Sequence, residues 1–299
     1  MPVIDLFKAV ASQLIVLHHL AYYGPMSDAA APLAPALIGW LGDQGRLAVQ
    51  VFFVIGGFLS ARAMSPLVRP DAVDRLVPGR ALRAFVRRYR RLALPFLCAL
   101  ALALVGAAIA RGLIQHDSIP AAPAAMQLLA HALLLQDVLG HEALSAGSWY
   151  VAIDLQLFGL MLLAVLLGQR LGAPWLPTLA LAMASLFVFN RDAQWDVCAL
   201  YFFGSYALGV FAWQAPGRDR PSAAFAILVL AALASLAIDF RIRIAVALGV
   251  ALVLAVAGRS GAALRYPGAR IGEALGRISY SVFLVHFPVC LVVNAIFAR

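Results

Sequence analysis

The stretch SQLIVLHHLAYYG, from Ser12 to Gly24, is an apolar run that carries two adjacent histidines. It lies within residues 6–23, and about 20 mostly apolar residues in a helix are enough to cross a lipid bilayer. Runs of the same kind recur along the chain, at about 46–64, 92–111, 122–139, 149–168, 174–190, 196–213, 222–238, 242–257 and 278–297. These runs predict an all-α fold, a polytopic membrane helical bundle of about ten transmembrane helices.

The composition also indicates a membrane protein. The chain has 299 residues, of which 64% are hydrophobic and 12% are charged, whereas a soluble protein is nearer half apolar and a quarter charged. The strand alternation of an outer-membrane barrel is missing. We therefore expect residues 1–299 to form a single integral-membrane domain. Cys98, Cys198 and Cys290 are far apart in apolar segments, and they predict neither a disulfide nor a metal site.

The distribution of basic residues predicts a topology. The formal net charge is +9, and residues 62–91 contain nine arginines, so the positive-inside rule places this loop and the N-terminus in the cytoplasm. Because the basic residues lie in loops between apolar helices, we expect no nucleic-acid partner. Ten spans place the arginines within residues 259–277 outside the cell, whereas a re-entrant 122–139 segment would place them inside. We favour ten spans.

The first span carries a polar stripe. At about 100° per residue, one helix face holds a group of polar side chains: Asp5, Lys8, Ser12, His19 and Tyr23. Asp5 and Lys8 have the i, i+3 spacing of an ion pair, and His18 points about 100° away from His19. An ionisable group at the bilayer centre costs about 2.5–3.5 kcal/mol, so His19 is a functional candidate. The plainer interpretation is a core histidine bonded to another helix, or an interfacial residue.

Arginines gather before the third span, in the sequence RRYRRLALP of residues 87–95. Arg88 and Arg91 are spaced i, i+3 and share a helix face. Such a cluster can be a topogenic stop with side chains that snorkel to the membrane surface. It can also bind a phosphorylated ligand, because arginine presents planar, always charged donors to phosphate. The density of arginines does not decide between the two interpretations.

Two later spans contain polar residues. SWYVAIDLQLFGL, at residues 148–160, places Asp154 and Gln156 inside an apolar helix, and a carboxylate there needs a cationic partner from another helix. In the last span, Ser279 and His286 lie two turns apart on one face, with Tyr280 beside them. The plainer interpretation of the serine and the tyrosine is hydrogen bonding between helices.

Five blocks in this order resemble the acyltransferase-3 family of bacterial membrane-bound O-acyltransferases. The blocks are Asp5, Lys8 and His19; FFVIGGF at 52–58; Arg88 and Arg91 before Pro95; Trp149 and Asp154; and GRISYSVFLVHFP at 276–288. Arginine is usual in the family in place of Lys8, serine in place of Gly56, and glutamate in place of Asp154. Since the sequence ends just after the last span, we expect a stand-alone transmembrane domain. We expect no periplasmic hydrolase-like domain of the kind fused to some family members.

The resemblance implies transfer of an acyl group, often acetyl, from an acyl-CoA to a hydroxyl group of a sugar or glycan acceptor. Acyl-CoA is made in the cytoplasm, and its phosphates suit charge-assisted hydrogen bonds from Arg88 and Arg91. We expect a multi-pass protein of the bacterial inner (cytoplasmic) membrane, with acyl-CoA as donor substrate and no metal. The expected partners are the acceptor, membrane lipid and surface-polysaccharide assembly proteins, whereas the oligomeric state is not predicted.

The resemblance also implies roles for the polar residues. His19 is the expected reaction centre, either as general base or as carrier of the acyl group, and the sequence leaves both open. The other expected members of the catalytic group are Asp5, Lys8 and Asp154. Five further residues are expected around the substrate or behind the reacting groups: Trp149, Gln156, Ser279, Tyr280 and His286.

Two other functions fit polar stripes in a ten-helix bundle. One is a transporter or flippase for a lipid-linked sugar or a small solute, and the other is an inactive scaffold in a surface-polysaccharide complex. The internal repeat of many transporters is not evident in the sequence. Dependence on acyl-CoA separates the three functions, because neither a transporter nor a scaffold needs a thioester.

Overall fold

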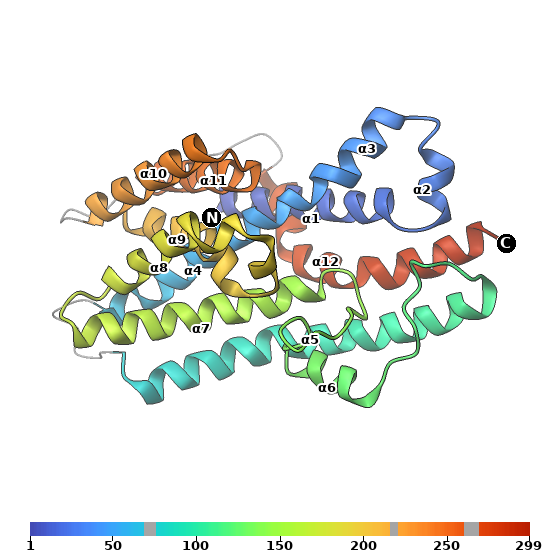
Figure 1. The fold of residues 1–299 in the computed structure, drawn as a ribbon, viewed down its shortest axis with the longest axis horizontal. Coiled ribbons are helices and arrows are strands. Elements are labelled where there is room, and N and C mark those ends of the chain that lie inside the picture. The colour runs from blue at the N-terminus through green and yellow to red at the C-terminus, as the bar shows by residue number, and fades with distance from the viewer. Residues whose placement is uncertain (69–75, 216–220, 260–268) are drawn as a thin grey trace. The chain divides into compact units, whose positions relative to one another are not determined.

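The computed structural model describes residues 1–68, 76–215, 221–259 and 269–299, and all regular structure in these ranges is helical (Figure 1). The elements are α1 (Pro2–Tyr22), α2 (Pro25–Ala30), α3 (Pro35–Gln44), η1 (Gly45–Ala48), α4 (Val49–Val68), α5 (Pro78–Leu113), α6 (Ala125–Ala132), α7 (Ser148–Arg170), α8 (Leu176–Phe187), η2 (Phe189–Arg191), η3 (Ala193–Val197), α9 (Ala199–Gln214), α10 (Pro221–Ile238), α11 (Ile242–Arg259) and α12 (Ala269–Phe297).

Five helical segments within the described ranges are long and apolar enough to cross a membrane: Pro2–Tyr22, Pro35–Val68, Pro78–Leu113, Ser148–Arg170 and Ala269–Phe297. Shorter apolar helices lie between the last two. The predicted all-α, polytopic membrane fold is therefore confirmed.

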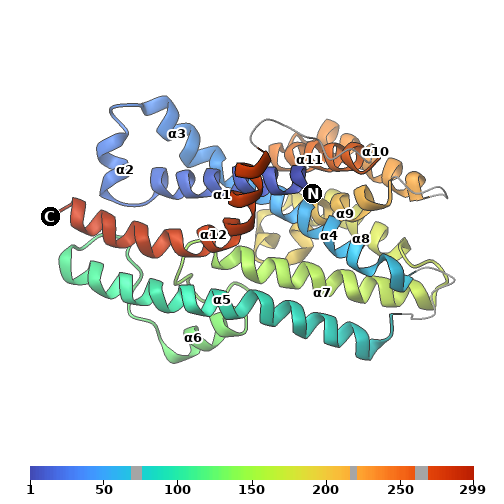
Figure 2. The ribbon, with the colours of Figure 1, turned by 180° about the vertical axis from the view of Figure 1, so that it is seen from behind.

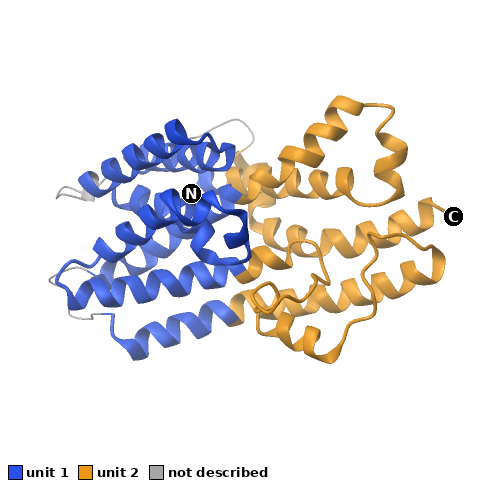
Figure 3. Cartoon of the chain, in the orientation of Figure 1, with its two compact units in different colours: residues 1–4, 50–89, 153–267 blue, residues 5–49, 90–152, 268–299 orange. Residues whose placement is uncertain are grey.

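The chain divides into two compact units (Figure 3). Unit 1 consists of Met1–Ile4, Gln50–Tyr89 and Ile153–Pro267, and unit 2 consists of Asp5–Val49, Arg90–Ala152 and Gly268–Arg299. Unit 1 thus holds most of the helices from α7 to α11, whereas unit 2 holds most of α1 and α12.

Helix α9 forms the centre of unit 1. It is buried along almost its whole length, and α8, α10 and α11 pack around it. It also meets α4 at two glycines: a Cβ on Gly57 would collide with the backbone oxygen of Tyr206, and a Cβ on Gly209 with that of Val54. Small residues let membrane helices approach this closely. The second glycine of the FFVIGGF block therefore has a packing role.

In unit 2, α1 and α12 pack side by side and run in the same direction (Figures 1 and 2). Near the start of both helices, a Cβ on Gly276 would lie 2.5 Å from the backbone oxygen of Asp5. Further along both, Nε2 of His286 lies 2.7 Å from Nδ1 of His19. The order of these two contacts shows that the helices are parallel, and Gly276 permits the close approach of the backbones.

Parallel packing corrects the predicted number of spans. If α1 and α12 cross the membrane in the same direction, an even number of crossings must precede α12. The ten-span prediction gives nine, and the segment at 122–139 accounts for the difference. Among the described residues, this segment forms only α6, which has 8 residues and is about 12 Å long. A helix of that length is too short to cross a membrane, so a span at 122–139 is not supported, and the re-entrant alternative agrees with the parallel packing.

Specific contacts turn the 122–139 segment back on itself. The buried His131 ring lies 2.8 Å, through Nδ1, from the oxygen of Gln127, and its Nε2 accepts the backbone N–H of Leu144 at 3.1 Å. Nδ1 therefore carries the proton, and burial lowers the pKa of His131, which keeps the ring neutral. Leu134 adopts a left-handed φ of 58°, which ends the helix. An apolar composition alone does not reveal this turn.

We expect Gly276→Ala to destabilise the protein, because the new methyl group would lie 2.5 Å from the oxygen of Asp5. Overpacking of this kind costs about 1–3 kcal/mol, which lowers the midpoint of thermal unfolding in detergent. Gly249→Ala in α11 is the control, since a Cβ there meets nothing within 4 Å. Equal unfolding midpoints for the two variants would contradict the close α1–α12 packing.

Candidate active site

Two histidines from opposite ends of the chain meet in unit 2. His19, in the last turn of α1, and His286, in the middle of α12, share a hydrogen bond of 2.7 Å between Nδ1 and Nε2. The two ring planes differ by only 14°. The two residues are 7% and 6% exposed, so the pair is largely shielded from solvent. A buried pair of this kind can bind and release protons without free access of water.

Aromatic side chains surround the histidine pair. The Tyr23 ring stacks near His19 with a centroid distance of 5.5 Å, and the edge of the same ring meets Phe287 at 5.6 Å. Phe283 lies 6.1 Å from His286 by ring centroids. These rings fix the positions of the imidazoles by packing, since they leave little room for other rotamers.

The adjacent His18 has a different partner. Its Nδ1 lies 3.0 Å from the backbone oxygen of Leu41 in α3, and a Cβ on Gly45 would approach the His18 Cβ to 2.7 Å. His18 therefore holds α3 against α1. The prediction that only one histidine of the pair lies on the polar stripe agrees with these separate contacts.

Asp5 and Lys8 form an ion pair with an Nζ–Oδ1 distance of 3.6 Å, as their i, i+3 spacing predicts. Eleven positions separate Lys8 from His19, which corresponds to about 17 Å along the helix. The two charged residues therefore share a helix with His19 but do not contact it. Asp5 and Lys8 can therefore belong to the predicted catalytic group only if they contact a part of the ligand that lies away from His19.

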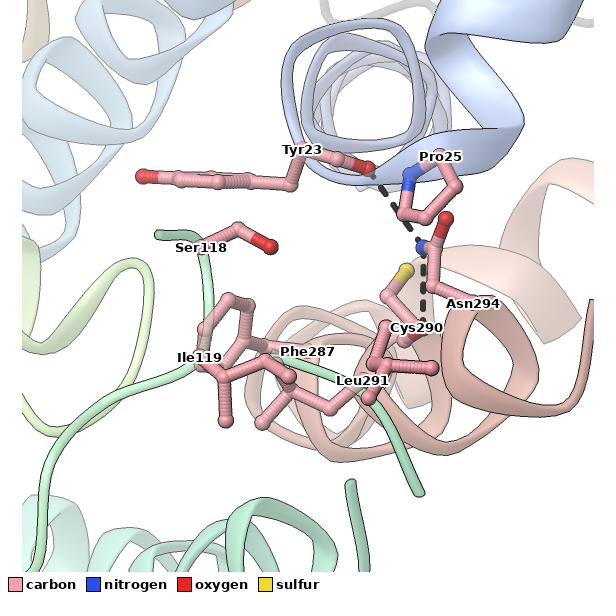
Figure 4. Close-up of a pocket in the computed structure, with 9 residues that line it drawn as sticks. Tyr23, Pro25, Ser118, Ile119, Phe287, Cys290, Leu291 and Asn294 are labelled. Atoms are coloured by element: carbon pink, nitrogen blue, oxygen red, sulfur yellow. Dashed lines mark hydrogen bonds between the residues drawn. The ribbon is translucent and has the colours of Figure 1, made fainter. Parts of the chain in front are cut away.

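Unit 2 also contains a pocket (Figure 4). Its lining is mostly apolar: Tyr23, Pro25, Ile114, Ser118, Ile119, Phe287, Cys290, Leu291 and Asn294. The amide of Asn294 accepts the N–H of Met26 at 2.9 Å and donates to the oxygen of Cys290 at 2.9 Å. These two hydrogen bonds fix the Asn294 side chain in the wall of the pocket. Tyr23 and Phe287 belong both to the pocket and to the surroundings of the histidines.

Unit 1 contains a buried ion pair between Arg88 of α5 and Asp154 of α7. Nη2 of Arg88 lies 2.8 and 2.7 Å from the two carboxylate oxygens, and Nε donates to Oδ2 at 3.2 Å. The side chain of Asp154 is only 2% exposed. The Arg88 guanidinium also lies 5.4 Å from the centroid of the Phe158 ring. The prediction that Asp154 needs a cationic partner from another helix is therefore confirmed.

Tyr206 was not predicted from the sequence, although it lies beside this ion pair. It is fully buried, and its hydroxyl donates to Oγ of Ser60 at 2.8 Å. A Cβ on Gly56 would lie 3.3 Å from both Oδ1 of Asp154 and Cε2 of Tyr206. The sequence could have indicated Tyr206 as a candidate, because a tyrosine inside an apolar span needs a hydrogen-bond partner for its hydroxyl when it is buried.

The remaining predicted residues make contacts between or within helices. Gln156 accepts the N–H of Ala199, at the start of α9, at 3.2 Å. Ser279 donates to a carbonyl of its own helix, and Tyr280 donates to the Leu92 oxygen of α5 at 3.0 Å. The Tyr280 contact is a hydrogen bond between two helices, as the plainer interpretation of this tyrosine predicted.

Two further predicted residues are described by their exposure. Arg91 is exposed in unit 2, and Trp149 is half-buried at the start of α7. Within the described part of the chain, no three His, Cys, Asp or Glu side chains gather as metal ligands would.

The Arg88–Asp154 pair predicts a specific stability pattern. Asp154→Leu leaves a partly buried guanidinium unpaired, and we expect a loss of about 2–3 kcal/mol, below the 3–5 kcal/mol of a fully buried pair. The double variant Arg88→Met/Asp154→Leu should recover most of it, because no charge stays buried without a partner. Thermal unfolding in detergent measures both variants.

The ion pair of Arg241 and Asp239 is the control, because the Asp239 side chain is 41% exposed. Its removal by Asp239→Ala should change stability by less than about 1 kcal/mol. A double variant as unstable as Asp154→Leu alone would show that the ion pair is not the source of the loss.

Comparison with protein families supports the resemblance seen in the sequence. The family model Acyl_transf_3, described as an acyltransferase domain, matches residues 1–299, the whole sequence. Neither the curated proteins nor the solved structures contain a match to the chain. With five candidate spans and a family match over its full length, the chain belongs to the acyltransferase-3 family and is a membrane acyltransferase.

Proposed function

We propose that this membrane acyltransferase moves an acyl group, in the simplest case acetyl, from cytoplasmic acyl-CoA to a hydroxyl group of a sugar or glycan. We place it in the inner membrane of a bacterium, with His19 as its reaction centre. The observation that carries the proposal is the buried hydrogen bond between His19 and His286 at 2.7 Å. An ionisable pair inside apolar helices is costly, and such residues are retained for function.

Imidazole suits this reaction because it can take up a proton or carry an acyl group near neutral pH. In the general-base route, His19 takes the hydroxyl proton, the acceptor oxygen bonds to the thioester carbon, and the C–S bond breaks to release CoA. In the covalent route, the acyl group first moves to His19 and the hydroxyl then attacks it. Both routes need one unprotonated nitrogen on His19.

The pocket in unit 2 supports a path for the acceptor. Tyr23 and Phe287 line the pocket and also flank the histidine pair, so an acceptor that approaches from this side would reach the pair past these two rings. The Gly24 backbone, with φ of 88°, lies against Asn294, one of the residues that line the pocket.

The arginines of α5 support binding of the CoA phosphates. Arg91 is exposed, so its guanidinium is accessible to a phosphate. Arg88 is held in a fixed orientation by Asp154 and Phe158. We propose Arg91 as the principal phosphate contact, with Arg88 as a second one that Asp154 orients.

We expect His19→Ala to abolish acyl transfer, whereas His18→Ala only weakens it through the loss of its contact with α3. The gene is deleted in its host and restored as wild type, His19→Ala or His18→Ala. Mass spectrometry of surface glycans and glycolipids then measures a mass step of one acyl group, which also identifies the acceptor.

Equal loss of the mass step in both histidine variants, at normal protein levels, would remove His19 as the reaction centre. Altered glycan export with no acyl difference would instead favour a transporter or flippase. The wild-type strain supplies the reference for both comparisons.

We expect Arg91→Gln to raise the KM for acetyl-CoA about tenfold, with kcat nearly unchanged, because a charge-assisted hydrogen bond contributes about 1.5–3 kcal/mol. Purified protein in detergent is tested with acetyl-CoA and with its analogue that lacks the 3′-phosphate. Arg90→Gln is the matched control, since Arg90 is also exposed but points about 100° away. The same KM in both variants would contradict a phosphate contact by Arg91.

A further inference from the structure

The hydrogen bond between His19 and His286 restricts which nitrogen of His19 can react. Nδ1 of His19 is engaged by Nε2 of His286 at 2.7 Å. Only Nε2 of His19 is therefore left to contact a substrate. In a neutral imidazole, one nitrogen carries the proton and the other accepts. The direction of the histidine–histidine bond thus decides whether His19 can act as a base.

Two arrangements of the protons are compatible with the bond. If His286 donates from Nε2, Nδ1 of His19 accepts, and the proton of His19 lies on Nε2. That nitrogen then has no lone pair for a hydroxyl proton or an acyl group. If His19 donates from Nδ1, its Nε2 is unprotonated and can react.

The second arrangement, which requires a proton on Nδ1 of His286, is the one that leaves Nε2 of His19 able to react. Nδ1 of His286 is buried, and it has no hydrogen bond of normal geometry within the described residues.

We propose that His286 is a positioning residue that accepts the Nδ1 proton of His19 and thereby keeps Nε2 of His19 free to react. This assignment of the protons rests on the proposed function, because His19 needs an unprotonated Nε2 to act as a base or to carry the acyl group. When Nε2 takes the hydroxyl proton, His19 becomes an imidazolium. His286 then accepts a charge-assisted hydrogen bond, which stabilises that cation until the proton is passed to the CoA thiolate.

The two helices are held together on both sides of the histidine pair. Towards the start of α12, a Cβ on Gly276 would lie 2.5 Å from the oxygen of Asp5 in α1. Towards its end, Oδ1 of Asn294 accepts the N–H of Met26, just beyond α1, at 2.9 Å. The alignment of the rings is therefore built into the packing, as a preorganised catalytic contact requires.

Nitrogen-15 NMR of histidine-labelled protein in detergent tests the proton positions without any acyl transfer. His19→Gln identifies the His19 signals by their disappearance. We expect Nδ1 of His19 to give the signal of a protonated nitrogen and Nε2 that of an unprotonated one. The reverse assignment for His19 would overturn the proposal.

Two amide variants test the role of His286 in the reaction. Gln can place its oxygen near the position of Nε2 and accept from His19, whereas Asn is one methylene shorter and cannot reach. We expect His286→Gln to retain kcat within about tenfold, and His286→Asn to lose at least about 100-fold, the lower range of general acid–base contributions. The KM for acyl-CoA should change by less than about twofold in both.

The outcomes separate this inference from the proposed function. Equal kcat values for the Gln and Asn variants would overturn the positioning role, even if the wild type transfers acyl groups. If the wild type transfers none, the proposed function fails, and the NMR signals of His19 in the wild type and in the two variants still decide the proton positions. A His19 that keeps the Nδ1–H form in His286→Gln and loses it in His286→Asn supports the inference.

Discussion

The hydrogen bond between His19 and His286 is the contact on which the candidate site depends. It joins residues that are 267 positions apart, and it forms only because α1 and α12 are parallel and closely packed. Gly276 allows that approach, since a side chain there would meet the backbone of Asp5. The same parallel packing requires an even number of crossings before α12. One short contact therefore links the chemistry of the site to the topology of the chain.

A second constraint acts in unit 1, where a carboxylate is buried in an apolar helix. Asp154 is tolerated because the Arg88 guanidinium occupies both of its oxygens, which offsets the cost of removing both charges from water. Gly56 leaves room beside the carboxylate, and the fully buried Tyr206 lies against the same glycine. The positions of Arg88 and Asp154 are thus explained by the packing of unit 1 as well as by any contact with a ligand.

Much of the fold was predictable because apolar runs and helical periodicity are local properties. They located the long spans, and they separated His19 from His18 on one helix. Hydropathy misjudged residues 122–139, because it counts apolar side chains and does not register the two hydrogen bonds of His131 that fold the segment back. The need of Asp154 for a cation was predictable from electrostatics. Its partner was not, because Arg88 is distant in sequence.

The contacts give a physical reason for the order of the five sequence blocks. The first and last blocks meet in unit 2, where His19 bonds to His286 and Gly276 packs on Asp5. One residue from each of the three middle blocks lies in a shared contact in unit 1, where Gly56 and Arg88 both lie against Asp154. Each block is short because it supplies one side of a contact. A single block is therefore a weak signal, whereas blocks that complete one another's contacts are a stronger one.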